Sequence, residues 1–489
     1  MTVYTIFAIV AAAAFGLALI RFFVSKPPNI LITFLQDFIG CFFIFSGFVK
    51  AVDPLGTGYK MHEYFEAFAG EGLRPVWEYL ATWSTFMAVV MIALELFVGI
   101  VLLIGWKPRF TVGIIWLLTL FFTFLTGYTF LSGYGITKPF MLASGAVMLL
   151  FALVAFPKKQ STRINLTFFS VGVIAAVFLF AKFATNTSFL IGSHKIVLNL
   201  QCINSAFEES KMKVTDCGCF GDFIKLKPWE TFYKDVILDL MILILVLNVK
   251  FVRPVFGNTV RQFLAFTTGA AALVFCLYNV YGNEPVIDFR PYKVGNDIND
   301  LRKEKKPAKV EMVFVYQSNK THLPKEFSYD DVMKGKMDYA EYDSMIERKD
   351  KVLDPGIPAK ITNLRIENDE GGDITDTLLH DPNYSLMVVS YNLNKTHEAA
   401  FKELNAIASA AEKAGVKFYA VTLNDGHVDE FRHRNQTAYP FYSADETPLK
   451  TIIRSNPGLV LMKNGVVVNK WHYRHLPTVE GLNKYYFKK

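Results

Sequence analysis

Eight long apolar segments occupy most of the first 282 residues of this sequence. We place them at about residues 3–22, 30–50, 83–104, 110–130, 138–156, 164–182, 232–249 and 262–281. A helix of about 20 apolar residues crosses the hydrocarbon core of a bilayer, so each segment can span a membrane. Only 19% of the 489 residues are charged, which is unusually few for a soluble protein. The sequence therefore predicts a polytopic α-helical membrane bundle over residues 1–282, with about eight spans in the lipid bilayer.

Basic residues in the short connections predict the orientation of the chain. The connections after the first, third, fifth and seventh segments lack Asp and Glu but contain Arg21, Lys26, Lys107, Arg109, Lys158, Lys159, Arg163, Lys250, Arg253 and Arg261. By the positive-inside rule these connections face the cytoplasm. The loop at 183–231 and the C-terminal domain then face the periplasm, as in a multi-pass protein of a bacterial inner membrane. Because the basic residues are dispersed, the net charge of +7 does not indicate a nucleic-acid partner.

The connection between the second and third segments predicts a turn followed by a short helix. Pro54, Gly56 and Gly58 are turn-forming residues. Aromatic residues over 59–68 then recur at helical spacing, which is typical of a helix lying on the membrane surface. A plain amphipathic connector is the alternative.

The outer loop at 183–231 carries the candidate reactive cysteines. Cys217 and Cys219 are separated by one glycine, and a disulfide across so short a ring is strained, which makes it reactive. Neighbouring basic residues favour the thiolate form, whereas nearby carboxylates oppose it: Lys211, Lys213, Lys225 and Lys227 against Asp216 and Asp222. The sequence predicts Cys217 and Cys219 as a reacting pair, and Cys202 in the same loop as the resolving thiol.

Other interpretations of the cysteines stay open. A static bridge from Cys202 to Cys217 or Cys219 would tie down the loop, as an oxidising compartment allows. A metal site would need a fourth ligand, and His194 is the only histidine nearby. Two further cysteines lie inside apolar segments, where they are either small apolar fillers or a relay from the loop to a membrane quinone: Cys41 and Cys276.

Ionisable residues also occur inside the apolar segments. Asp37, Glu95 and Asp239 lie within predicted spans, where carboxylates either handle protons or hold the bundle together through hydrogen bonds. Because of these carboxylates, a transporter is a further alternative function, although the sequence shows no obvious inverted repeat. We expect three lysines near outer helix ends to extend toward the membrane surface: Lys50, Lys182 and Lys234.

Residues 283–489 have the composition of a soluble protein and predict two parts. The first, residues 283–382, begins with an extended tether and continues as a small β-rich module with a strand at 310–316 and a loop at 367–373. The second, residues 383–489, predicts a mixed α/β domain. The domains therefore divide at about residues 282 and 382.

Residues 383–489 are similar in element order to a thioredoxin fold. Strands at 386–391 and 416–423 flank a helix at 397–414, and strands at 458–463 and 466–472 are joined by Asn464-Gly465, a strong hairpin signal. Asn456-Pro457 stands at the position of the proline loop and is a candidate cis-proline. The position of the reactive cysteines reads Tyr-Asn-Leu-Asn-Lys-Thr, and no cysteine follows Cys276. We therefore expect this domain to bind a client or partner without exchanging disulfides.

Several motifs together resemble the DoxX-like and MauE-like membrane family, in the form with a C-terminal thioredoxin-like domain. They lie at residues 46–56, 60–65, 105–109, 123–128, 216–222, 227–229 and 286–292. The resemblance implies a four-helix core from the segments at 30–50, 83–104, 110–130 and 232–249, with 138–156 and 164–182 as an insertion. It also implies electron or thiol traffic at the membrane. MauE-like proteins are linked to methylamine utilisation, and DoxX-like proteins to quinone-coupled oxidation, so a membrane quinone is the candidate cofactor.

Two functions from different classes follow. The first is envelope thiol–disulfide or electron-transfer chemistry on an exported protein client, with Cys217 and Cys219 as reacting pair and the thioredoxin-like domain as binding module. The alternative is a non-enzymatic inner-membrane scaffold, in which the cysteines form a structural disulfide and the outer domains dock partners. The oxidation state of the cysteines separates the two, because a structural bridge stays fully oxidised and inert.

Overall fold

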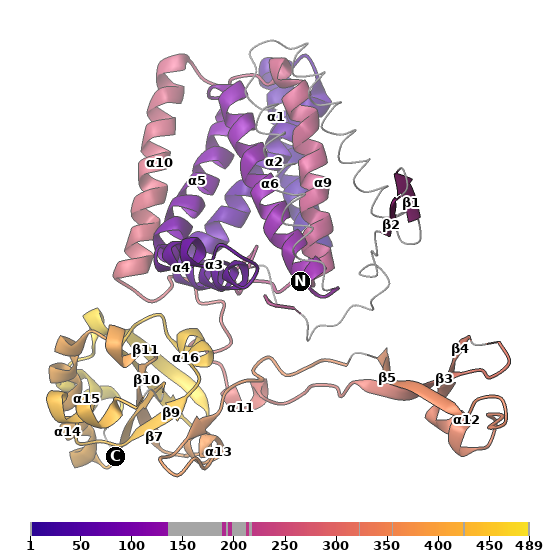
Figure 1. Ribbon diagram of the computed structural model, residues 1–489. Helices are drawn as coiled ribbons and strands as arrows, with labels where there is room; N and C mark the ends of the chain where they lie inside the picture. The colour runs from indigo at the N-terminus through magenta and orange to yellow at the C-terminus, as the bar shows by residue number, and fades with distance from the viewer. Residues whose placement is uncertain are drawn as a thin grey trace. The chain divides into compact units, whose positions relative to one another are not determined.

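The chain forms two compact units, Met1–Phe289 and Arg290–Lys489, in a computed structural model (Figure 1). The structure describes residues 2–134, 188–191, 194–197, 212–214, 218–321, 323–354, 356–423 and 426–487. The predicted segments at 138–156 and 164–182 lie outside the described residues, as do Cys202 and Cys217. The two units are a helical unit and a sheet unit, and each is described by itself.

The helical unit contains five helices, among its described residues, that are long and apolar enough to cross a membrane. They are α1 (Val3–Ser25), α2 (Ile30–Val52), α5 (Ser84–Ile104), α6 (Pro108–Ser132) and α10 (Asn258–Tyr281). These helices confirm five of the predicted apolar segments to within a few residues. The total of eight spans stays a prediction.

The seventh predicted segment, α9 (Pro228–Leu247), is a helix of a different character. It packs against α6 and α2 but carries Glu230, Lys234, Asp235 and Asp239, and it is not among the five apolar candidates. Pro228 occupies its first turn, and the Lys227 backbone N–H donates to Glu230 Oε2 at 3.0 Å, which satisfies a donor at the helix start. The helix therefore brings ionisable side chains into the bundle.

Close backbone approach between α2 and α5 organises the bundle (Figure 1). A Cβ added at Gly99 would lie 2.9 Å from the Ile44 backbone nitrogen and 3.0 Å from the Gly40 carbonyl oxygen. Small residues at such crossings let helices in a membrane pack by direct contact. Around this pair, α1 packs on α2, α10 on α5, and α6 on α9.

Two shorter helices, α3 (Pro54–Ala69) and α4 (Arg74–Thr82), cover one end of the bundle (Figure 1). The predicted turn at Pro54, Gly56 and Gly58 is wrong, because these residues form the first turns of α3. Asp53 caps this helix by accepting a hydrogen bond from the Gly56 N–H at 3.2 Å, and Pro54 suits its first turn. Gly58 also lets α3 approach α5, since a Cβ there would lie 3.1 Å from Thr85 Cα.

The sheet unit contains a six-stranded sheet, among its described residues, in the order β11-β10-β7-β8-β9-β6. Strands β7, β8 and β9 are parallel, whereas β10, β11 and β6 run antiparallel to their neighbours. The elements are β6 (Ile366–Glu367), β7 (Tyr384–Ser390), α14 (Phe401–Ala414), β8 (Lys417–Thr422), α15 (Val428–Asn435), β9 (Phe441–Ala444), α16 (Glu446–Ile452), β10 (Gly458–Lys463), β11 (Val466–His472) and α17 (Val479–Tyr485). The predicted order of strands and helices is confirmed, and the thioredoxin-like assignment stays a prediction.

Local sequence signals explain several of these elements. Asn464 and Gly465 have φ values of 48° and 78°, as a tight hairpin turn requires, and they join β10 to β11. Gly415 ends α14 in a left-handed conformation with φ 71°. The Asn456-Pro457 peptide bond is cis.

Two apolar clusters pack in the sheet unit, one including Met387, Val389 and Val460 and the other Leu386, Val388 and Phe401. Alternate residues of β7 thus point to opposite faces of the sheet, as strand geometry dictates. Tyr292 and Ile298 join the first cluster, and β6 joins the sheet. The sheet unit therefore includes residues on both sides of the predicted boundary at residue 383. The short helices α11 (Ile298–Leu301) and α13 (Thr375–Leu379) precede β7.

A separate three-stranded antiparallel sheet lies between these parts in sequence. It consists of β3 (Lys309–Gln317), β4 (Pro324–Ser328) and β5 (Ser344–Asp354), with α12 (Tyr329–Met333) after β4. Strand β3 is central, so the predicted strand at 310–316 is confirmed. A two-stranded hairpin, β1 (Ser188–Ile191) with β2 (His194–Val197), precedes the cysteine segment in the helical unit.

Candidate functional site

Cys219 borders a small cavity at the end of the helical unit where α2 and α6 end and α9 begins. The cavity has a volume of about 40 Å³. Its lining includes Lys50 from α2, Tyr64 from α3, Met91 from α5 and Thr126 from α6. Residues from four helices thus meet the cysteine segment at one point.

A tight turn holds Cys219 at this position. Gly218 and Gly221 adopt φ values of 62° and 51°, which glycine tolerates without strain, and the Gly221 N–H donates to the Gly218 carbonyl at 3.1 Å. Phe220 is buried at 1% exposure and packs edge-on against Phe42, with ring centroids 6.0 Å apart. Phe220 thus anchors the turn in the bundle, and the neighbouring Cys219 is half-buried.

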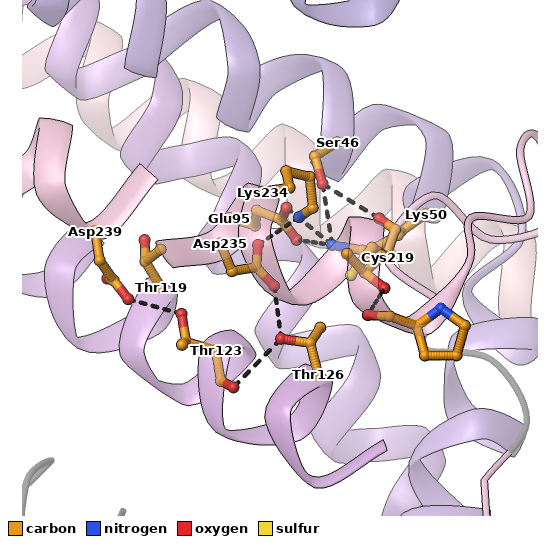
Figure 2. A network of polar contacts seen from close by, with 12 residues as sticks. Ser46, Lys50, Glu95, Thr119, Thr123, Thr126, Cys219, Lys234, Asp235 and Asp239 are labelled. Atoms are coloured by element: carbon orange, nitrogen blue, oxygen red, sulfur yellow. Dashed lines mark hydrogen bonds and ion pairs between the residues drawn. The ribbon is translucent and has the colours of Figure 1, made fainter. Parts of the chain in front are cut away.

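A buried ion pair lies beside the cavity (Figure 2). The Lys50 ammonium donates to both carboxylate oxygens of Glu95, at 2.9 and 2.8 Å, and their side chains are 4% and 2% exposed. Lys50 also donates to Ser46 Oγ at 3.1 Å, and Ser46 Oγ donates to the Cys219 carbonyl at 3.4 Å. The ion pair is therefore connected to the backbone of the cysteine segment through one hydroxyl.

A second polar cluster joins α9 to α6 (Figure 2). Lys234 pairs with Asp235, and Thr126 Oγ1 donates to the same carboxylate at 3.0 Å. Farther along the two helices, Thr123 Oγ1 donates to Asp239 at 2.7 Å. These bonds supply partners that a lipid environment does not, so they hold α9 against α6.

The lysine prediction is wrong for Lys50 and Lys234. Both side chains are buried and paired within the bundle instead of extending to the surface. A carboxylate within reach of each ammonium, at Glu95 and Asp235, replaces the water it would otherwise need. The third lysine of that prediction, Lys182, lies outside the described residues.

A further ion pair lies toward the other end of the helical unit. Arg21 Nη2 of α1 is 2.7 Å from Asp37 Oδ1 of α2, and the same guanidinium donates to the Leu103 carbonyl of α5. Nearby, Gln36 Nε2 donates to the Leu102 carbonyl at 2.8 Å. These contacts tie α1 and α2 to the end of α5. All three carboxylates predicted inside spans, Asp37, Glu95 and Asp239, thus have polar partners.

The structure places only part of the predicted reactive set. Cys219 lies at the cavity, whereas its predicted partners Cys217 and Cys202 fall outside the described residues. Cys41 is a half-buried free thiol in α2, and Cys276 is a buried free thiol in α10 that packs with Ile92. No three His, Cys, Asp or Glu side chains gather as a metal site within the described part of the chain.

The cavity does not fit the ring of a quinone. A water molecule needs about 10–15 Å³ by this measure of volume, so about 40 Å³ accommodates a few water molecules. The second cavity at the cysteine segment, bordered by Cys219 and Lys225, is about 10 Å³. We therefore derive no step through a quinone at these cavities.

Asp239 was named from the sequence, but Asp235 and the two threonines that bind these carboxylates were missed. Asp235 and Asp239 lie four residues apart on α9, facing Thr126 and Thr123, which lie three apart on α6. Residues at these spacings share one helical face, so the pattern of two carboxylates could have marked the face of α9 that enters the bundle. Their partners on α6 depend on helix packing and carry no comparable signal.

These features define a helical membrane-type protein with a polar site inside the bundle and a second, sheet-containing unit. Residues 28–137 match the family described as methylamine utilisation protein MauE. The match covers α2 to α6, which provide most of the cavity lining. A search of curated proteins and a search of solved structures each found no match. The predicted MauE resemblance is therefore confirmed for residues 28–137, and the DoxX resemblance stays a prediction.

Proposed function

We propose that this protein carries out thiol–disulfide or electron-transfer chemistry at a membrane, with Cys217 and Cys219 as the reacting pair. The observation that carries the proposal is the position of Cys219 in a tight turn beside a cavity that is also lined by Lys50 of a buried ion pair. Half-exposed thiols near basic groups are the reactive ones, whereas thiols in apolar surroundings are inert. The MauE match supports it, because that family is linked to a redox pathway.

The proposed exchange needs no group beyond the thiols themselves. A client thiolate attacks one sulfur of the Cys217–Cys219 disulfide, so that bond breaks, a mixed disulfide forms and the other cysteine leaves as a thiolate. The client's second thiolate then attacks the mixed disulfide and releases the pair. Two electrons pass from client to pair, and the two client protons end on the released thiols. A disulfide-bearing partner protein then takes up the two electrons: one cysteine of the pair attacks its disulfide, and Cys202 resolves the mixed disulfide and releases the reduced partner. The third thiolate attacks the resulting bond to Cys202, which restores the Cys217–Cys219 disulfide and frees Cys202.

The sheet unit has a binding role in this proposal. Residues 283–489 contain no cysteine, so they cannot take part in exchange. We place this thioredoxin-like domain and the cysteine segment on the periplasmic side of a bacterial inner membrane, on the basis of the basic connections. There the sheet unit would hold an exported client.

Thiol trapping in intact cells tests the proposal. Cells are quenched with acid and labelled with a mass-adding maleimide, for wild type and for Cys202→Ser, Cys217→Ser and Cys219→Ser. We expect a mixture of oxidised and reduced forms and a client adduct in one of the single variants. Cys41→Ser and Cys276→Ser are the matched controls, because both thiols lie inside helices, and they should leave the pattern unchanged.

A non-enzymatic scaffold is the second candidate. The lack of cysteines in the sheet unit favours it, since a docking domain needs none. This candidate predicts a chain that is fully oxidised, resists mild reductant and forms no adduct. That result in the trapping experiment would replace the redox proposal.

A further inference from the structure

Burial of the Lys50 ammonium carries a large desolvation cost. Its side chain is 4% exposed, near the end of a helix whose other residues are mostly apolar. Desolvating an ammonium and a carboxylate costs more than their attraction returns in many proteins, and uncharged residues of similar size often replace such pairs without loss. A buried pair in a membrane bundle is therefore a candidate for a functional role.

Several contacts fix the Lys50 ammonium in one place. Glu95 accepts two hydrogen bonds from it, Ser46 accepts a third, and the Phe122 ring lies under it with its centroid 4.6 Å from Nζ. All three N–H donors of the Lys50 ammonium thus have acceptors within the bundle. Such contacts hold the positive charge at a defined point.

The positive member of the pair is the one that borders the cavity. Lys50 and Cys219 both line it, whereas Glu95 does not. Thr57 also lines the cavity, and its hydroxyl is buried without a hydrogen-bond partner among the described residues. The cavity has the volume for a few water molecules, and the Thr57 hydroxyl can hold one of them beside Lys50 and Cys219.

Other charged groups face Cys219 from the surrounding elements. Lys60 of α3 lines the same cavity and pairs with Glu63 at 2.5 Å, while Lys234 and Asp235 of α9 pair with each other. On the segment itself lie Asp222 and Lys225. Lys60 and Glu63 are 17% and 43% exposed, so water screens their effect more than that of the buried Lys50.

We infer that Lys50 is a positioning residue whose buried charge favours the thiolate form of Cys219. This inference rests on the proposed function, since it names the group that prepares the reacting thiol. Lys50 and Cys219 line the same cavity, and an opposite charge near a titrating group favours its charged form. Ser46 hydrogen-bonds to both the Lys50 ammonium and the Cys219 carbonyl, so it fixes the position of the cysteine backbone relative to the ammonium.

The experiment measures the pH dependence of alkylation in a full-length chain that retains only Cys219. The other four cysteines are replaced by Ser, and the rate of reaction with iodoacetamide is followed in detergent from pH 6 to 10. We expect Lys50→Met to move the midpoint of the profile up by about one pH unit, which lowers the rate near neutral pH about tenfold. Lys50→Arg should stay close to the parent, and Lys60→Met should shift the midpoint less.

The double variant Lys50→Met/Glu95→Gln separates loss of the ammonium from exposure of an unpaired carboxylate. We expect its midpoint to stay above the parent value, because the buried positive charge beside the cavity is still gone. It buries neither charge, so it serves as the test if Lys50→Met alone does not fold. A return to the parent profile in the double variant would overturn the inference, as would an unchanged midpoint in Lys50→Met.

The alkylation experiment and the thiol-trapping experiment can fail independently of each other. An unchanged alkylation profile together with client adducts in the trapping experiment would refute the role of Lys50 and leave the redox function standing. A shifted profile with a fully oxidised, inert chain in cells would refute the redox function and leave Lys50 as a group that acts on Cys219.

Discussion

The helical unit and the sheet unit differ in how deeply their ion pairs are buried. In the helical unit, ion pairs such as Lys50–Glu95 and Lys234–Asp235 have both members buried inside the bundle. In the sheet unit, pairs such as Arg434–Glu398 lie on the surface, with side chains 51% and 42% exposed. The interior of the sheet unit is built on apolar side chains such as Val389 and Leu404.

This difference follows from the surroundings of each charge. Inside a helix bundle in lipid, water does not solvate a charged side chain, so another part of the protein has to supply its polar partner. The helical unit keeps several such pairs despite their cost, and one borders the candidate thiol site. The sheet unit buries mainly apolar residues, and in pairs such as Lys417–Asp381, with side chains 60% and 6% exposed, one member stays in contact with water.

The largest expected effect comes from breaking a buried pair. Arg21→Met leaves the Asp37 carboxylate, which is 0% exposed, without its cation, and we expect a loss of about 3–5 kcal/mol in the free energy of unfolding. Unfolding of the purified protein in detergent measures it. Arg434→Met removes an exposed pair of the sheet unit and should leave that stability unchanged. Equal effects of the two changes would remove the contrast between the units.

A smaller loss should follow from crowding the closest helix contact. Gly99→Ala places a methyl group 2.9 Å from the Ile44 backbone nitrogen, which cannot move aside as a side chain can, so we expect a loss of about 1–3 kcal/mol. Gly16→Ala on α1 is the matched control, because a Cβ there meets nothing within 4 Å. The same unfolding measurement applies, and a Gly99→Ala protein as stable as wild type would disprove the tight crossing.

Hydrogen bonds of the same type should differ in value between the units. Thr126→Val removes a donor from the buried Asp235 carboxylate, and we expect a loss of about 1–2 kcal/mol in the unfolding free energy. Thr451→Val in the sheet unit removes an exposed bond to the Thr447 carbonyl, which water can replace. If Thr451→Val costs as much as Thr126→Val, burial does not set the value of these bonds.

The smallest effect concerns acid. Burial alone raises the pKa of Asp381, but the Lys417 ammonium and the Asn383 backbone N–H outweigh it, so the pKa lies below its ordinary value. The unfolded chain then binds the proton more readily, and stability is lost as the pH falls through about 4 toward the folded-state value. Because Lys417 is 60% exposed, we expect less than about 1 kcal/mol.

Amide hydrogen exchange in β7 and β8 between pH 3 and 6 measures the acid effect. Asp381→Asn cannot ionise, so it should flatten that pH dependence without changing exchange in the helical unit. A pH dependence that persists in Asp381→Asn would assign the effect to another carboxylate.

Much of the fold could be read from local patterns. The apolar segments that became α1, α2, α5, α6 and α10 were recognisable because a span must be continuous in sequence. The hairpin of β10 and β11 was recognisable from Asn464-Gly465, since only such residues adopt that turn readily. The start of α3 was not, because Asp53 and Pro54 can begin a helix or a turn, and packing against α5 decides between them.

The sequence by itself determined most of the apolar helices, the hairpin of β10 and β11, the cysteine segment and most of the ionisable residues in the spans, because each depends on residues close together in the chain. Only the tertiary structure decided which of those residues meet. Lys50 pairs with Glu95, which is 45 residues away in the sequence, and Thr126 donates a hydrogen bond to Asp235, which is 109 residues away. Such pairings depend on how each helix is rotated about its axis and which neighbour it packs against, and these are settled by the shapes of whole faces rather than by any local pattern.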